Sequence, residues 1–326
     1  MANNQSCVTI LMATYNGAKF LSKQIESIIA QTYSDWQLII RDDRSADNTV
    51  QIIESFLSDD RIKLINYGSD YGSACINFSN LIEWAKQNSR GYIMFSDQDD
   101  IWKNDKIEKS VGFIKNLERE YPEIALLGYT KFDFITEHGD SIHKQILLPP
   151  RLKTSTMLVE NYAWGCTMIM NQKLLKIAKK IPYNAVNHDY WIALLCSAFG
   201  KVILLDEALI YYRQHSHNVS GNVSNSFWKN RITRYITQKE LMMKHFAANL
   251  STVMLFFHIY GDKLNFEKKM LFENYIEHYK STSIALLTGM FNKKILKFGV
   301  LKNLTMFPFL LFFKSKIYKI ALDRLK

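Results

Sequence analysis

Residues 91–104, Gly-Tyr-Ile-Met-Phe-Ser-Asp-Gln-Asp-Asp-Ile-Trp-Lys-Asn, place an acidic cluster directly after an apolar run. The run at 92–95 is typical of a buried strand, and Asp97, Asp99 and Asp100 follow it closely. Because ionised carboxylates are costly to desolvate, we expect the strand to end at a crevice. One or two carboxylates, together with phosphate oxygens, commonly hold a divalent cation in nucleotide sites. A polar turn is the alternative, since Asp is a common loop residue.

Apolar strands alternate with helical patterns on the N-terminal side of this stretch. The predicted strands cover 8–13, 36–40, 62–66 and 92–95, and the predicted helices cover 21–29, 48–56 and 78–86. This alternation indicates an α/β fold with a mostly parallel sheet and helices on both faces. Ligands of such sheets bind beyond the carboxyl ends of the strands. Three strand ends are polar, namely Thr14-Tyr15-Asn16, Asp42-Asp43 and residues 97–100, and their convergence favours a metal site over a polar turn.

Charge is unevenly distributed along the 326 residues. Residues 226–326 contain 18 Lys and Arg against 6 Asp and Glu, whereas residues 1–225 contain 23 against 25. We therefore predict a nearly neutral body at 1–225 and a helical, basic region at 226–326 that faces an anionic surface. The four cysteines are far apart and the N-terminus lacks a signal-peptide pattern, so we expect reduced thiols and a cytoplasmic location.

The basic region also contains an apolar run at 304–313. A helix that spans a bilayer needs about 20 apolar residues, so we predict instead a helix that lies in the membrane interface with lysines at the headgroups. Packing of these helices on the body, or on another subunit in a homo-oligomer, is the alternative. The apolar run argues against nucleic acid as the partner.

The polar strand ends resemble family 2 glycosyltransferases, which have the Rossmann-like GT-A fold. The resemblance covers residues 7–220 and rests on Thr14-Tyr15-Asn16, residues 42–47 and residues 97–100. It implies that residues 1–225 form the catalytic domain. Residues 96–102, 164–167 and 213–215 resemble bacterial rhamnosyltransferases that build cell-wall or surface polysaccharides. This implies inverting, metal-dependent transfer from a nucleotide sugar, dTDP-L-rhamnose in particular, to a lipid-linked glycan at the inner face of the plasma membrane. Another UDP- or dTDP-sugar is the alternative donor.

The resemblance also implies roles for individual residues. Asp43, or Asp42 beside it, would accept a hydrogen bond from the base, and Asp97 would face the ribose or a metal-bound water. Asp99 and His215 would bind Mg²⁺ or Mn²⁺, and Asp97 is a further candidate ligand. The remaining residues implied in nucleotide-sugar binding are Thr14, Tyr15, Asn16, Gln98 and Arg213.

Asp189 lies where the family has its catalytic carboxylate, which deprotonates the acceptor hydroxyl. A helix N-cap is the alternative role for this Asp. His188 departs from the acidic residue usual at its position, so it either tunes Asp189, contacts the acceptor or packs. Trp102 and Trp164 either stack on sugar rings or belong to the core. The Gln-x-x-Arg-Trp signature of processive members is missing, which predicts transfer of one sugar per encounter.

Two other classes of protein compete with this interpretation. A sugar nucleotidyltransferase would have a glycine-rich, basic phosphate loop after the first strand, whereas residues 14–19 contain a single glycine. A nucleotide-binding membrane scaffold without turnover would not need Asp97, Asp99 and Asp189 together.

Overall fold

The computed structural model describes residues 7–68, 72–143, 146–215 and 237–326. Its centre is a ten-stranded, mostly parallel sheet, as the alternation of strands and helices predicts. β9 is antiparallel to both of its neighbours, and β5 is antiparallel to β10. In the order of the sheet the main strands are β3 (Ile62–Leu64), β2 (Trp36–Asp42), β1 (Val8–Thr14), β4 (Tyr92–Ser96), β9 (Met168–Met170), β6 (Ala125–Ile135), β10 (Gly200–Arg213) and β5 (Ile101–Trp102). The short strands β7 (Ser141–Ile142) and β8 (Arg151–Leu152) pair with β6 and β10 respectively.

Helices cover both faces of the sheet because alternate strand residues point to opposite sides. Ile10 and Met12 of β1 belong to one apolar cluster, and Leu11 belongs to the other. The first cluster is covered by α1 (Leu21–Ile29), α2 (Thr49–Ser55) and α4 (Lys106–Glu120). The second is covered by α3 (Ala74–Asn88), α5 (Thr154–Met157), α6 (Gln172–Ile177) and α7 (His188–Phe199).

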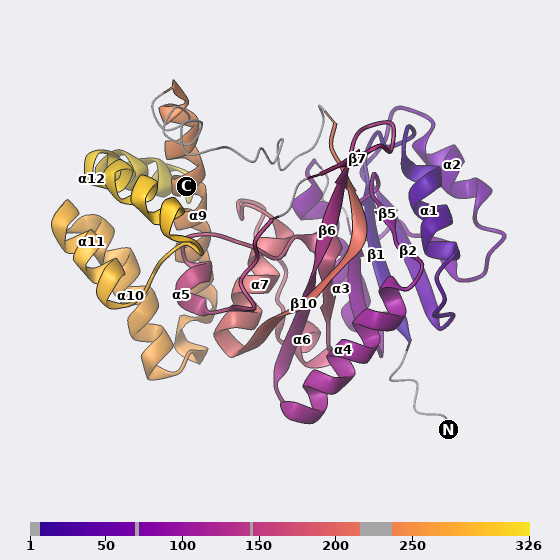
Figure 1. Ribbon diagram of the computed structural model, residues 1–326, viewed down its shortest axis with the longest axis horizontal. Helices are drawn as coiled ribbons and strands as arrows, with labels where there is room; N and C mark the ends of the chain where they lie inside the picture. Colours follow the sequence, from indigo (N-terminus) through magenta and orange to yellow (C-terminus); the bar gives the residue numbers. More distant parts are fainter. Residues whose placement is uncertain (1–6, 69–71, 144–145, 216–236) are drawn as a thin grey trace.

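The C-terminal region is helical, as predicted, and it packs on the second cluster. Figure 1 shows its helices at the end of the molecule opposite α1 and α2. They are α9 (Lys239–Tyr260), α10 (Phe266–Lys280), α11 (Ser283–Asn292) and α12 (Val300–Asp323). Phe256 and Phe309 from this region share one continuous core with Trp191 of α7. The predicted domain boundary at 225 lies outside the described residues.

Candidate active site

The polar strand ends lie at one edge of the sheet, as the sequence predicts. In the parallel register Thr14 is opposite Asp42, and Met12 is opposite Ser96, which immediately precedes the acidic loop at 97–100. The Thr14 hydroxyl donates to Asp42 Oδ1 at 2.8 Å. The ends of β1, β2 and β4 therefore form one polar edge.

Tyr15 stands at the rim of this edge with 57% of its surface exposed. Gln98 fixes its backbone, because Tyr15 N–H donates to Gln98 Oε1 at 2.9 Å and Gln98 Nε2 donates to Tyr15 O at 3.0 Å. A Cβ on Gly17 would lie 2.2 Å from Gln98 Oε1, so a side chain at this position would displace the Gln98 amide. Gln98 thus joins the acidic loop to the end of β1, a role that the sequence did not indicate.

The turn after β2 is organised by Asp42. Its carboxylate accepts from Ser45 N–H at 2.7 Å and from the Ser45 hydroxyl at 2.6 Å. Asn16 has a φ of 47° and bonds to the same turn, donating its N–H to Ser45 Oγ at 2.8 Å and accepting from Ala46 N–H at 2.8 Å. An Asn tolerates this left-handed backbone better than most residues do.

Asp43 is buried beside the same turn. Its oxygens accept from Gly72 N–H at 3.2 and 3.1 Å, and Arg41 Nη1 lies 3.9 Å away. The Asp42 carboxylate therefore uses its acceptor capacity within the turn. Asp43 has fewer hydrogen-bond partners, so its carboxylate can accept from a further donor.

The acidic loop concentrates negative charge beside Asp189. Burial, with the charges of Asp99 and Asp189, raises the pKa of Asp97 well above its ordinary value. Asp99 Oδ2 lies 2.7 Å from His215 Nε2, and the His215 ring stacks on Phe20 at a centroid distance of 4.9 Å. Clustered carboxylates of this kind favour a dication, and carboxylate oxygens suit Mn²⁺ or Mg²⁺.

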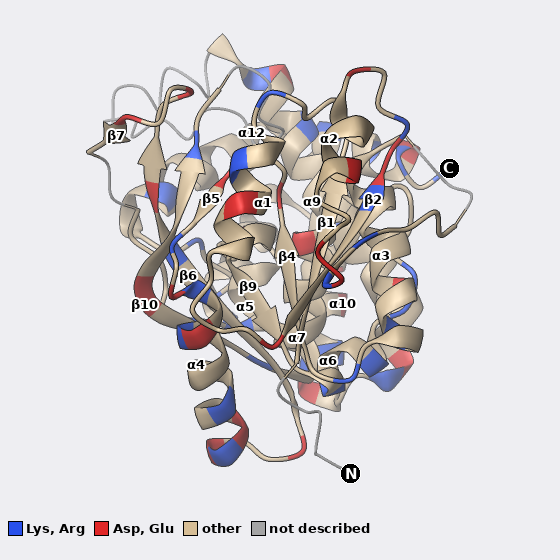
Figure 2. Cartoon of the chain, turned by 90° about the vertical axis from the view of Figure 1, so that its right-hand side faces the viewer, with Lys and Arg blue, Asp and Glu red and all other residues tan. Residues whose placement is uncertain are grey.

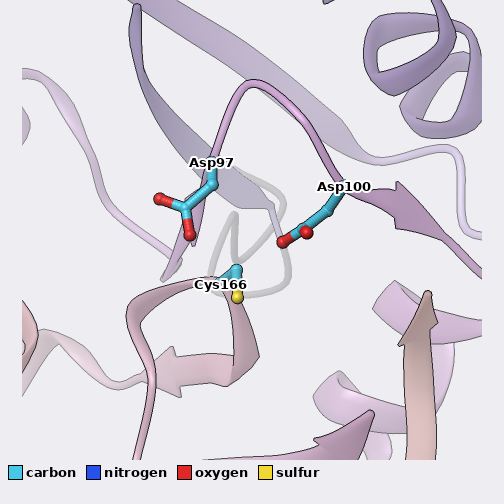
Figure 3. Close-up of side chains that lie close together, drawn as sticks. All are labelled: Asp97, Asp100 and Cys166. Atoms are coloured by element: carbon cyan, nitrogen blue, oxygen red, sulfur yellow. The ribbon is translucent and has the colours of Figure 1, made fainter. Parts of the chain in front are cut away.

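A second set of donors lies under this loop. Figure 3 shows Asp97 and Asp100 on opposite arms of the loop, with Cys166 between them, and their ligand atoms lie within 4.8 Å of one another. Burial raises the pKa of Cys166 well above its usual range, so the thiol stays protonated. A protonated, soft sulfur does not fit a hard cation, so this cluster is a poor site for Mg²⁺ or Mn²⁺. Of the predicted ligands the structure brings Asp99 and His215 together, whereas Asp97 does not join them in a group of three ligand atoms within 4.8 Å among the described residues, so their role as a ligand set stays a prediction.

A buried lysine lies beneath the acidic loop. Burial lowers the pKa of Lys106 to about 7, while Asp100 and Cys166 act in the opposite direction. Its Nζ lies 4.1 Å from the centre of the Trp102 ring. No sequence signal separates Lys106 from the solvated lysines of α4, because only the tertiary fold places it near Asp100.

Asp189 enters the same crevice from the first turn of α7. Its Oδ2 accepts from Gly165 N–H at 3.2 Å, and its Oδ1 accepts from Tyr190 N–H at 2.5 Å. Burial raises the pKa of Asp189 to about 6, and these two backbone hydrogen bonds partly offset that rise. The arrangement is that of a carboxylate held in a fixed orientation beside the acidic loop, with a pKa suited to accepting a proton near neutral pH.

Comparison with known proteins assigns the family. The sequence model of glycosyl transferase family 2 matches residues 9–177, more than half of the chain. The chain belongs to glycosyl transferase family 2. It is similar over 249 residues, with 26% identity, to TuaG of Bacillus subtilis, a protein named for teichuronic acid biosynthesis; the match covers 76% of this chain and 92% of TuaG.

Two further relatives have names that state a donor. The chain is 30% identical over 226 residues to the dTDP-rhamnosyl transferase RfbG of Shigella flexneri, covering 65% of this chain and 75% of RfbG. It is 30% identical over 218 residues to the UDP-Glc:α-D-GlcNAc-diphosphoundecaprenol β-1,3-glucosyltransferase WfgD of Escherichia coli, covering 66% of this chain and 80% of WfgD.

Solved structures establish the GT-A fold. TarS residues 1–349 of S. aureus in complex with UDP-GlcNAc match with a TM-score of 0.55 and 13% identity, over 98% of this chain and 89% of that one. The mannosyltransferase PcManGT of Pyrobaculum calidifontis in complex with GDP-Man and Mn²⁺ matches with a TM-score of 0.51 and 13% identity, over 98% and 86%.

His188 of this family 2 glycosyltransferase is a packed side chain. It stacks on Phe78 at a centroid distance of 3.7 Å and meets Phe95 edge-on at 5.1 Å. Burial lowers the pKa of His188 to about 3, so the ring is neutral. A Cβ on Gly165 would lie 2.6 Å from His188 Nε2. Of the three predicted roles the structure therefore shows packing, against the turn that orients Asp189.

Two predicted contacts with the substrates are contradicted by burial. Trp102 is 1% exposed in the core under α1 and α4, so it offers no ring face to a sugar. Arg213 is 2% exposed, and its guanidinium donates to the carbonyls of Asp99 and Glu137, each at 2.8 Å. Arg213 thus holds the acidic loop in place and does not extend toward a diphosphate. Trp164 is half-buried, and its contact with a sugar stays a prediction.

Proposed function

We propose that this glycosyltransferase inverts the anomeric centre of a sugar, with dTDP-L-rhamnose as the first candidate donor and a lipid-linked, growing surface polysaccharide as the acceptor. The supporting observation is the position of Asp189, a half-buried and oriented carboxylate whose charge acts on Asp97 at the polar edge of the sheet. RfbG is named for dTDP-rhamnose, and WfgD is named for a diphosphoundecaprenol acceptor. A UDP-sugar is the second candidate donor, because WfgD is named for UDP-Glc.

The donor nucleotide would occupy the edge formed by β1, β2 and β4. The exposed ring of Tyr15, held by Gln98, offers a flat face for a pyrimidine, and Asp43 can accept from the base. Asp97, Asp99 and His215 would hold Mg²⁺ or Mn²⁺. When bound, the cation supplies Lewis-acid stabilisation of the departing nucleoside diphosphate.

Asp189 would then take the proton of the acceptor hydroxyl as its oxygen attacks the sugar C1 carbon. The new C1–O bond forms on the face opposite the breaking C1–O bond to the diphosphate, so the configuration at C1 inverts. A base is most effective when its pKa lies near the working pH, and burial moves the pKa of Asp189 toward that range. The hydrogen bond from Gly165 holds the carboxylate in one orientation, which reduces the entropy lost in the transition state.

The C-terminal region would bring the enzyme to its acceptor. We place residues 226–326 at the inner face of the bacterial plasma membrane as a peripheral region, and we expect one sugar per encounter. Within the described parts of the chain, no helix has both the length and the apolarity needed to cross a bilayer.

A donor panel tests this proposal. The full chain is incubated with Mn²⁺ or Mg²⁺, a diphosphoundecaprenol-linked or synthetic glycan acceptor, and a set of dTDP- and UDP-sugars, while nucleoside diphosphate release is followed. Acceptor-dependent release from dTDP-L-rhamnose is expected to exceed release from every other donor. Preference for a UDP-sugar would refute the rhamnose assignment. If no donor released its nucleoside diphosphate, the proposed glycosyltransferase activity would be refuted.

A further inference from the structure

The C-terminal helices contain a long segment without a carboxylate. Residues 278–322 include eight lysines and no Asp or Glu. Elsewhere the two signs are mixed, as in α4, where red and blue segments alternate (Figure 2). Four of these lysines pair with carboxylates outside the segment: Lys280 with Glu277, Lys297 and Lys302 with Glu160, and Lys316 with Glu240. The positive charge of the other four lysines is not offset by any acid within the segment.

Large apolar side chains are exposed on the same segment. On α12 the exposed residues Leu301, Leu304, Leu311 and Phe312 follow helical spacing along one side, and 81% of the Phe312 surface is accessible. The opposite side of α12 is buried in the core, so residues 304–313 of this helix are apolar on both sides. A helix of this kind normally buries its outer side as well, in protein or in lipid.

The neighbouring helix extends this surface. The Ser283 hydroxyl at the start of α11 donates to Leu311 O at 2.9 Å, which places α11 beside the middle of α12. Ile284 and Phe291 of α11 are 74% and 66% exposed. We refer to Ile284, Phe291, Leu301, Leu304, Leu311 and Phe312 together as the α11–α12 face. Contiguous exposed apolar surface marks a binding site for a protein or a membrane.

The lysines near the α11–α12 face favour a membrane over a protein as its partner. Lys293 and Lys294 are exposed at the turn between α11 and α12, and neither forms an ion pair with any described residue. In a two-fold dimer the same patch meets itself, so lysines of one copy would lie against lysines of the other, with no carboxylate on the α11–α12 face to pair with them. An anionic bilayer instead receives the apolar side chains in its interface and pairs the lysines with its phosphates.

We propose that the α11–α12 face is the membrane-docking surface of this enzyme, with α11 and α12 lying in the interface of an anionic bilayer. The proposal deepens the proposed function, since a lipid-linked acceptor is presented at such a surface. It assigns the contact to two helices at the end of the molecule opposite α1 and α2 (Figure 1).

Vesicle co-sedimentation of the full chain tests the docking surface. The wild type is expected to bind vesicles that contain phosphatidylglycerol, and to bind pure phosphatidylcholine vesicles much more weakly. Phe312→Glu is expected to reduce the partition coefficient at least tenfold, because an apolar anchor is replaced by a charge that the lipid repels. The double variant Lys293→Gln, Lys294→Gln should lose about tenfold or more, and added salt should reduce wild-type binding in the same direction.

Leu147→Glu is the matched control, because Leu147 is 77% exposed on the catalytic body, outside the α11–α12 face. It should bind vesicles as the wild type does, and the melting temperatures of all variants should agree. Wild-type binding by Phe312→Glu would overturn the proposal. The proposal would also be overturned if the wild type formed an oligomer that does not bind vesicles and if Phe312→Glu dissociated that oligomer. Donor turnover with a water-soluble acceptor separates the docking proposal from the proposed function. Phe312→Glu should keep this turnover, whereas the wild type and every variant would lack it if the proposed function is wrong.

Discussion

Substitution of Gly165 by Ala tests how Asp189, the proposed catalytic carboxylate, is held. The added Cβ would lie 2.6 Å from His188 Nε2, 3.3 Å from its Cε1 and 3.6 Å from Asp189 Cβ. His188 cannot yield easily, because its ring is stacked on Phe78. The 3-10 turn Gly165–Thr167 must therefore move and lengthen the 3.2 Å hydrogen bond from Gly165 N–H to Asp189.

The expected loss has two parts. Overpacking of this kind costs about 1–3 kcal/mol in the free energy of unfolding, which urea denaturation measures. A displacement of about 1 Å at a catalytic group can cost on the order of 100-fold in rate, which kcat/KM for donor turnover measures. The loss in kcat/KM should persist at temperatures where the variant is fully folded, since it arises from the orientation of Asp189.

Gly112→Ala is the control for this experiment. Gly112 lies within α4, and a Cβ there would meet nothing within 4 Å. This variant should be more stable by about 0.5–1 kcal/mol, because Ala loses less conformational freedom in a helix than Gly does, and its activity should be unchanged. Wild-type kcat/KM in Gly165→Ala would refute the claim that this turn orients Asp189.

Three further outcomes follow from the site. Gln98→Leu removes both bonds to the Tyr15 backbone, so the KM for the donor should rise about tenfold; an unchanged KM would remove Gln98 from this role. The pKa of Asp189 is raised to about 6 and only its ionised form accepts a proton, so kcat/KM should be level above that pH and fall tenfold per unit below it. An acid limb near the ordinary aspartate value of 3.8 would contradict this. Chelation should abolish turnover reversibly, and His215→Ala should raise the Mn²⁺ concentration needed for half-maximal rate; equal metal requirements in the variant and the wild type would exclude His215 as a metal ligand.

The sequence was informative about the sheet because its signals are local. Alternating strands and helices, and carboxylates placed directly after an apolar run, depend on neighbouring residues, and parallel strands bring their carboxyl ends to one edge. That is why Thr14, Asp42 and Asp97 could be expected to converge. The family motifs supplied the role of Asp99 and His215, and the structure brings these two side chains within hydrogen-bonding distance across 116 positions of sequence.

The sequence was less informative where a side chain turns inward. Arg213 and Trp102 have the chemistry of ligand contacts, but β10 returns beside the acidic loop and β5, which buries both. Gln98 and Gly165 act through hydrogen bonds that involve the backbone and residues distant in the sequence. The residue type alone does not predict which partner such a bond has. The excess of lysines was visible along the chain, but the exposed side of α12 depends on which side α9 covers.

The central claim is that Asp189 is the base of sugar transfer, and Asp189→Asn tests it most directly. Asn keeps the size of the side chain and an oxygen that can accept from Gly165, but it cannot take up a proton. Nucleoside diphosphate release with the best donor and acceptor should fall by about 10²–10⁴-fold, with the KM for the donor within a few-fold of wild type. A rate within a few-fold of wild type would contradict the account.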